Sequence, residues 1–226
     1  MTTFVLIPGA GGSAWYWHRL VPELRCRGHD PVPVDLPASD DAAGLDTYAD
    51  VVRAAIGDRA DVVVVAQSMG GLVAPLVCAR ASVRLLVLLN AMVPTPGETG
   101  HRWWLSTEHA AAIAAEAARN GQPADEVMDP AYVFFHDVPA AVVDRAMAAG
   151  DPPQSGRPFD DPWPLPAWPD VPTRFLQARG DRFFPLRFQR RVVGERLGIA
   201  RDEMPGGHLV ALSRPADLAD RLVSYL

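Results

Sequence analysis

The chain has 226 residues, of which 21 are basic and 27 acidic, giving a formal net charge of −6. All 21 basic residues are arginine, which excludes lysine-dependent chemistry such as Schiff-base catalysis and the phosphate-binding loop that contains Gly-Lys. The acidic balance argues against a nucleic-acid partner, while a hydrophobic content of 49% is typical of a globular domain.

Short apolar runs alternate with helical patterns along the first ninety residues. The patterns predict strands at 4–7, 32–34, 62–66 and 83–89, and helices at 15–27, 48–56 and 69–80. The run at 62–66 is rich in valine, which is typical of a strand buried on both faces. Such alternation implies a parallel sheet with right-handed crossovers.

The alternation stops from about Pro94 to Pro169, where two helices are predicted, at 107–120 and 139–149. Eight prolines between 151 and 172 predict an extended return linker. The alternation then resumes with a strand at 173–178, a helix at 186–197 and a short run near 203–204. It ends with a helix from Pro215, which Ser213 is placed to cap. We therefore expect an α/β fold: an open, mostly parallel sheet of about six strands with helices on both faces. Residues 1–93 and 170–226 would form the core, and 94–169 a helical cap inserted within the single domain.

Two further expectations concern the environment of the chain. The first residues lack the basic segment of a signal peptide, and the longest apolar stretch, 85–93, is too short to cross a bilayer. We expect a cytoplasmic protein without a membrane partner. Cys26 and Cys78 lie in predicted helices and are expected to be buried free thiols.

A serine lies at the junction of a predicted strand and a predicted helix. The segment Ala66-Gln67-Ser68-Met69-Gly70 is close to the nucleophile elbow G-x-S-x-G, with alanine in place of the first glycine. The pattern alone is also compatible with a serine at a helix start. Its place between a buried strand and a helix favours a nucleophile.

A serine nucleophile needs a base and an orienting acid, which in this kind of fold follow in the order acid, then histidine. Asp181 follows the strand predicted at 173–178, and His208 lies in a glycine-rich loop before the last helix. Each taken alone fits a turn or a surface loop. Three such residues in this order, each after a strand, point to a catalytic triad.

These motifs resemble the α/β-hydrolase fold superfamily, and within it the small methylesterase and hydroxynitrile-lyase branch. The resemblance covers nearly the whole chain, through the first strand and oxyanion loop at 4–15, the second-strand loop at 34–39, the cap at 134–137 and the histidine loop at 208–215. It implies that Ser68 is the nucleophile, His208 the base and Asp181 the acid. It also implies an oxyanion hole made by the backbone N–H groups of Ala10 and Met69.

The implied activity is that of a carboxylic ester hydrolase. It would cleave a small, mostly apolar ester through an acyl-enzyme intermediate, without a cofactor or a metal. The expected partner is the small-molecule ester itself; the exact substrate and the oligomeric state stay open. Aromatic residues of the cap line the substrate pocket in one interpretation and form the cap's own core in the other: Trp103, Trp104, Phe134, Phe135 and Trp163.

Other functions were weighed against this one. A ligand-binding or receptor-like protein with little turnover, and a biosynthetic thioesterase or cyclase, stay open. Lyase chemistry is disfavoured, because the similar hydroxynitrile lyases use a lysine near the histidine, where this chain has Leu209. The segment 9–14 also matches the dinucleotide motif G-x-G-x-x-G/A, with Asp35 as the ribose-binding acid. That alternative is disfavoured because it leaves the triad unexplained.

Overall fold

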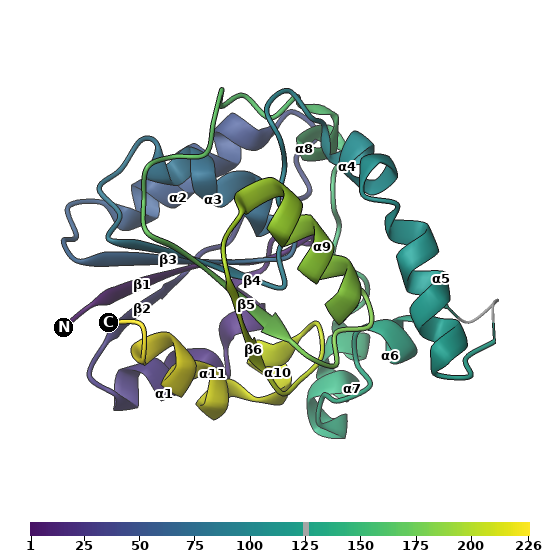
Figure 1. Cartoon of the computed structure of the whole chain (residues 1–226). Coiled ribbons are helices and arrows are strands. Elements are labelled where there is room, and N and C mark those ends of the chain that lie inside the picture. The colour runs from purple at the N-terminus through teal and green to yellow at the C-terminus, as the bar shows by residue number, and fades with distance from the viewer. Residues whose placement is uncertain (124–126) are drawn as a thin grey trace.

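The computed structural model describes residues 1–123 and 127–226 and contains one six-stranded sheet (Figure 1). Its order is β2-β1-β3-β4-β5-β6, and every neighbouring pair is parallel. The strands are β1 (Thr3–Ile7), β2 (Asp30–Pro33), β3 (Val62–Gln67), β4 (Leu85–Leu89), β5 (Thr173–Ala178) and β6 (Arg201–Met204). The expected parallel sheet of about six strands is confirmed.

Helices cover both faces of the sheet, as predicted (Figure 1). One face carries α2 (Leu45–Ile56), α3 (Gly70–Cys78) and α9 (Leu186–Leu197), and the other α1 (Leu20–Cys26), α10 (Val210–Ser213) and α11 (Pro215–Val223). In β3, Val62 and Val64 belong to the first core while Val63 and Val65 belong to the second. Because both faces are buried, the strand is apolar from Val62 to Ala66 instead of alternating with polar residues.

The segment between β4 and β5 is helical. It contains α4 (Gly100–Ser106), α5 (His109–Arg119), α6 (Pro130–Val133), α7 (Ala140–Ala149) and α8 (Arg157–Asp160). Helices α5, α6 and α7 lie at the side of the molecule opposite the two termini (Figure 1). The proline-rich return segment is not extended throughout, since it contains the short helix α8, with Pro158 in its first turn.

Three local predictions were wrong. The helix expected at 15–27 is a 3₁₀ turn (Ala14–Trp17) followed by α1, which begins at Leu20 so that Pro22 falls in the first turn, where its missing N–H costs little. Ser213 does not cap α11: it ends α10, and its Oγ has no partner within the described residues. Cys26 is exposed at the end of α1, and only Cys78 is partly buried. Among the helices described, none combines the length and the apolar character needed to span a bilayer.

Candidate active site

The strand order places two loops around one crevice of the sheet. The chain leaves β1 toward β2 on one side and returns to β3 on the other, so β1 and β3 flank the point where the order reverses. In open α/β sheets ligands bind at the carboxyl ends of the strands at this point. The loop after β1 and the serine after β3 therefore meet where a ligand site is expected.

Ser68 occupies a strained turn between β3 and α3. Its φ angle of 52° lies in the left-handed region, which side chains other than glycine seldom adopt. A Cβ at position 70 would lie 3.0 Å from the carbonyl oxygen of Pro8, and one at position 71 would lie 2.0 Å from that of Met92. The two glycines after the serine thus let α3 pack against the neighbouring loops. Residues 66–70 therefore make a sharp turn from strand to helix with Ser68 at its apex, the backbone geometry that a nucleophile elbow requires.

Asp181 and His208 form a buried pair. His208 Nδ1 lies 2.9 Å from Asp181 Oδ2, and the two residues are both only 2% exposed. The other carboxylate oxygen, Oδ1, accepts hydrogen bonds from the backbone N–H groups of Phe183 and Phe184 at 2.9 and 2.8 Å. Because the carboxylate accepts from its own loop and from the ring, it fixes the imidazole with Nδ1 protonated and leaves Nε2 as an unprotonated acceptor.

Asn90, which the sequence analysis did not single out, anchors the histidine loop. It follows β4, is fully buried and has a φ angle of 44°. Its Oδ1 accepts from the N–H of Ala178 at 2.8 Å, and its Nδ2 donates to the carbonyl oxygens of Gly207 and His208 at 3.2 and 3.1 Å. One side chain thereby ties the end of β5 to the histidine loop. The sequence feature that could have identified Asn90 is its position, as a polar residue directly after a buried apolar strand.

The cap also holds the histidine loop. Asp137 Oδ2 accepts a hydrogen bond of 2.7 Å from the N–H of Gly207. A Cβ at position 207 would lie 2.6 Å from Asp137 Oδ1, so the loop needs glycine for this close approach. Beside it, burial and the positive charge of Arg182 lower the pKa of His136. We expect His136 to be neutral at pH 7.

The predicted oxyanion donors lie on the two loops at the crevice. Within the described residues, no hydrogen bond uses the backbone N–H of Ala10 or of Met69. A Cβ on Gly9 would lie 2.9 Å from Ser68 Cβ, so the loop after β1 approaches the elbow closely. The next loop residue, Gly11, donates its N–H to Gln154 Oε1 of the return segment at 2.9 Å. Two uncommitted donors beside a serine suit a developing negative charge on oxygen.

Gln67 contacts His208 from the end of β3. Its Nε2 lies 3.0 Å from His208 Nε2 and 3.4 Å from the His208 carbonyl oxygen. Both partners accept, so the amide donates to each. No hydrogen bond links Ser68 Oγ to His208 within the described part of the chain.

Aromatic rings surround the imidazole. The rings of Phe134, Phe183 and Phe184 lie with their centroids 5.5, 5.1 and 5.2 Å from that of His208. Phe134 was among the predicted pocket residues, whereas the two phenylalanines after Asp181 were not singled out. Such an apolar wall around the imidazole suits an apolar ligand.

The other four predicted pocket residues have no ring contact with His208 within the described residues. Trp103 and Trp163 are fully buried in the core on the α3 and α9 face, and their indole N–H groups donate to the carbonyl oxygens of Val93 and Leu72. Trp104 is partly buried and packs on His109, and Phe135 packs against the opposite core. Of the five, Phe134 is the one with a ring contact to His208.

His109 and Asp35 do not join the site. His109 Nε2 donates to the carbonyl oxygen of Phe183 at 2.8 Å, and burial lowers the pKa of His109 to about 4. The ring is therefore neutral at pH 7 and serves as a packing residue. Asp35 is exposed, and its Oδ1 accepts from the N–H of Ala14 at 2.7 Å, so it caps a turn.

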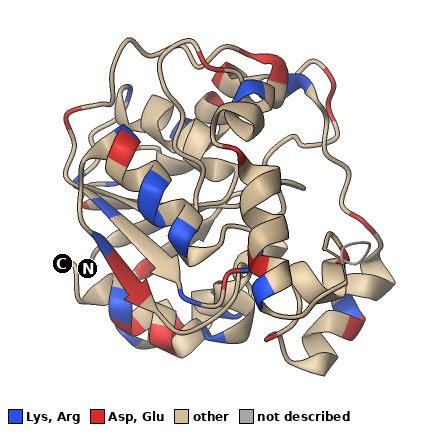
Figure 2. Cartoon of the chain, turned by 45° about the vertical axis from the view of Figure 1, so that its right-hand side comes forward, with Lys and Arg blue, Asp and Glu red and all other residues tan. Residues whose placement is uncertain are grey.

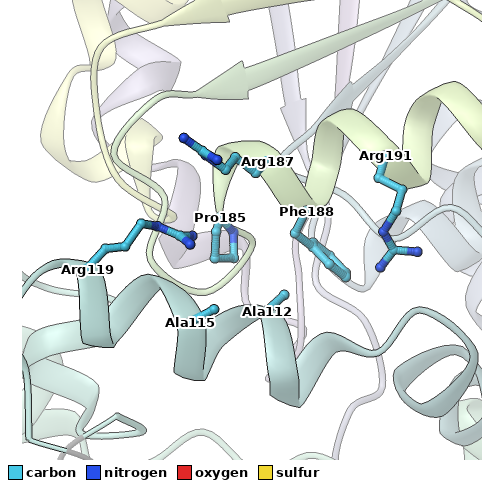
Figure 3. A pocket seen from close by; sticks show the side chains of 7 residues that line it. All are labelled: Ala112, Ala115, Arg119, Pro185, Arg187, Phe188 and Arg191. Carbon is cyan, nitrogen blue, oxygen red and sulfur yellow. The ribbon is translucent and has the colours of Figure 1, made fainter.

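A separate groove of about 220 Å³ lies between α5 and α9 (Figure 3). Its basic lining residues are Arg119, Arg187 and Arg191, and the remaining ones are Ala112, Ala115, Pro185 and Phe188. Arg119 and Arg191 each pair with a glutamate on their own helix, Glu116 and Glu195. Elsewhere, acidic and basic residues are interspersed in the view of Figure 2. The groove contains no residue of the Ser68, Asp181 and His208 set.

The fold is that of the α/β hydrolases. The model of the alpha/beta hydrolase family matches residues 4–221, and the chain belongs to this family. It is also 34% identical over 109 residues to a protein described as a probable esterase PIR7A from Oryza sativa subsp. indica. That match covers 42% of this chain and 41% of the relative, so it spans less than half of the relative's length.

Solved structures agree in fold over essentially the whole chain. A pyrethroid hydrolase from Sphingobium faniae JZ-2 superimposes with a TM-score of 0.76 at 23% identity, covering 99% of this chain and 96% of its own. Polyneuridine aldehyde esterase gives 0.74 at 20% identity, covering 100% and 99%. The methylesterase MES16 from Arabidopsis gives 0.75 at 21% identity, covering 100% of both chains. The resemblance to the methylesterase branch is thereby confirmed at the level of the fold.

Proposed function

We propose that the protein is a serine-dependent carboxylic ester hydrolase that works through an acyl-enzyme intermediate. The observation that carries the proposal is the buried contact of 2.9 Å between His208 Nδ1 and Asp181 Oδ2 at the same sheet edge as the strained Ser68. The description of the rice relative as a probable esterase, and the names of the similar structures, support the same reaction class.

The reaction would proceed in two halves. Ser68 Oγ attacks the ester carbonyl carbon while His208 Nε2 takes the hydroxyl proton, and the same proton is then given to the departing alcohol. Water next attacks the acyl group on Ser68 with His208 again as the base, which releases the carboxylic acid. Asp181 holds the imidazole tautomer and stabilises the imidazolium formed in each half.

The N–H groups of Ala10 and Met69 would stabilise the oxyanion in both halves. One such donor is worth about 3 kcal/mol of barrier in a site that excludes water. The phenylalanine rings at 5.1–5.5 Å from the imidazole support a small and mostly apolar ester as substrate. This reaction needs neither a cofactor nor a metal.

Labelling with a fluorophosphonate probe tests the nucleophile. Serine Oγ bonds to phosphorus, fluoride leaves, and the hydroxyl proton passes to the histidine. We expect the wild type to be labelled and Ser68→Ala to be unlabelled. Ser213→Ala is the matched control, since Ser213 lies in α10 outside the site, and it should label like the wild type. An unlabelled wild type, or equal labelling of Ser68→Ala, overturns the assignment.

Turnover of simple esters separates catalysis from binding. We expect the wild type to hydrolyse p-nitrophenyl esters of short acids, and Asp181→Asn to fold but turn over about 10⁴-fold more slowly, because the imidazole tautomer is no longer fixed. A labelled protein that hydrolyses none of the esters would instead support the receptor-like alternative.

A further inference from the structure

We propose that Gln67 is a positioning residue that competes with Ser68 for the base. The inference rests on the proposed function, since it concerns how the same nucleophile is activated. Gln67 precedes the nucleophile, is 2% exposed and ends β3. Nothing in the reaction described above uses it.

The competition follows from the single lone pair of a neutral imidazole. Nδ1 of His208 carries the hydrogen that is donated to Asp181, so Nε2 has one acceptor site. The Gln67 amide lies 3.0 Å from this nitrogen. While that hydrogen bond exists, Nε2 cannot take the hydroxyl proton of Ser68.

The position of the amide oxygen extends the argument. A Cβ on Gly9 would lie 2.4 Å from Gln67 Oε1, so the amide oxygen lies against the loop after β1 while the amide nitrogen faces the imidazole. The Gln67 amide thus spans the interval between the proposed oxyanion loop and the base. A substrate carbonyl that enters between them has to move the amide, which frees Nε2 as the ester arrives.

The second hydrogen bond explains why the amide holds this orientation. Gln67 Nε2 also faces the carbonyl oxygen of His208 at 3.4 Å. Reversing the amide would set its oxygen against two acceptors in a buried site, which is unfavourable. Gln67 therefore keeps a donor on the base for as long as the imidazole is neutral.

The test is the second-order rate of inactivation by a small fluorophosphonate, which reports proton transfer from Ser68 to His208. Gln67→Met removes the donor and keeps the length of the side chain. We expect it to react roughly fivefold faster than the wild type, the factor that corresponds to one net hydrogen bond. Gln67→Asn, whose amide is one methylene shorter, should also react faster. The matched control is Gln189→Met, because Gln189 is equally buried but donates to Ala91 instead, and its rate should not change.

A spectroscopic readout separates competition from simple support of the fold. In protein labelled with ¹⁵N-histidine, the Nε2 resonance of His208 should move downfield in Gln67→Met, because the nitrogen loses a donated hydrogen bond. The resonance is assigned by its loss in His208→Ala. A wild type that does not label overturns the proposed function itself. A labelled wild type whose Gln67 variants react no faster, or more slowly, overturns this inference alone, as does an unchanged Nε2 resonance.

Discussion

Replacing Asn90 with glycine removes the side chain that joins the histidine loop to the end of β5. Three hydrogen bonds are lost, to the N–H of Ala178 and to the carbonyl oxygens of Gly207 and His208. At about 1 kcal/mol for each bond, the free energy of unfolding should fall by about 3 kcal/mol. Glycine adopts the φ angle of 44° without strain, so this loss belongs to the side-chain contacts.

Asn90→Ala isolates the backbone contribution. It loses the same hydrogen bonds but keeps a Cβ in the left-handed region. Its free energy of unfolding should therefore be about 1 kcal/mol lower than that of Asn90→Gly. Both variants leave the backbone at His208 without its anchor. Because a displacement of about 1 Å in a catalytic group can cost on the order of 100-fold in rate, we expect ester turnover to fall by a similar factor.

Urea denaturation followed by tryptophan fluorescence measures the stability, and hydrolysis of a p-nitrophenyl ester measures the turnover. Asn120→Gly serves as the control, since Asn120 is exposed after α5 and its loss should change stability by less than about 0.5 kcal/mol. If Asn90→Gly matches the wild type in both measurements, the histidine loop is held by other contacts and the reasoning is refuted.

Three further predictions follow from other contacts. Gly9→Ala should fold but lose most ester turnover, because its Cβ would lie 2.9 Å from Ser68 Cβ and would displace the serine turn; turnover near the wild-type level would contradict the close approach. Burial lowers the pKa of His109 from 6.5 to about 4, so the unfolded chain binds the extra proton and stability falls by up to about 3 kcal/mol as pH drops from 6.5 to 4. The free energy of unfolding is measured by urea denaturation at several pH values. His109→Gln should remove its fall between pH 6.5 and 4, whereas replacing the exposed His101 with glutamine should leave that fall unchanged. Arg196→Met should lower the free energy of unfolding by about 3 kcal/mol, because it removes the cationic partner of the buried Glu98 carboxylate, which among the described residues keeps only neutral donors on Ser106 and Thr95; a change below 1 kcal/mol would show that the pair contributes little.

The sequence allowed the sheet and the chemistry-bearing positions to be predicted for one physical reason. Strands buried on both faces are continuous apolar runs, and the residues that follow them lie at one edge of a parallel sheet. Ser68, Asp181 and His208 each follow a strand in this way, and their residue types and order along the chain single them out. Asn90 obeys the same rule after β4 and was passed over, because an asparagine there carries no known catalytic pattern.

The contacts of Gln67 and of the aromatic residues between β4 and β5 could not be predicted from the sequence. Whether Gln67 faces solvent, substrate or base depends on how the histidine loop folds over the sheet, about 140 residues later in the chain. The indole N–H groups of Trp103 and Trp163 donate to the backbone carbonyl oxygens of other segments, and no local sequence pattern predicts these partners. The assignment of a substrate pocket to the cap aromatics stays a prediction, with Phe134 the member that contacts the base ring.

Trapping the covalent intermediate tests the central claim most directly. The protein is mixed with p-nitrophenyl acetate, quenched in acid within the first turnover, digested and analysed by mass spectrometry. We expect an acetyl group on the peptide that contains Ser68 and none on the same peptide of Ser68→Ala. Hydrolysis of the ester without an acetylated Ser68, or with the acetyl group on another residue, would contradict it.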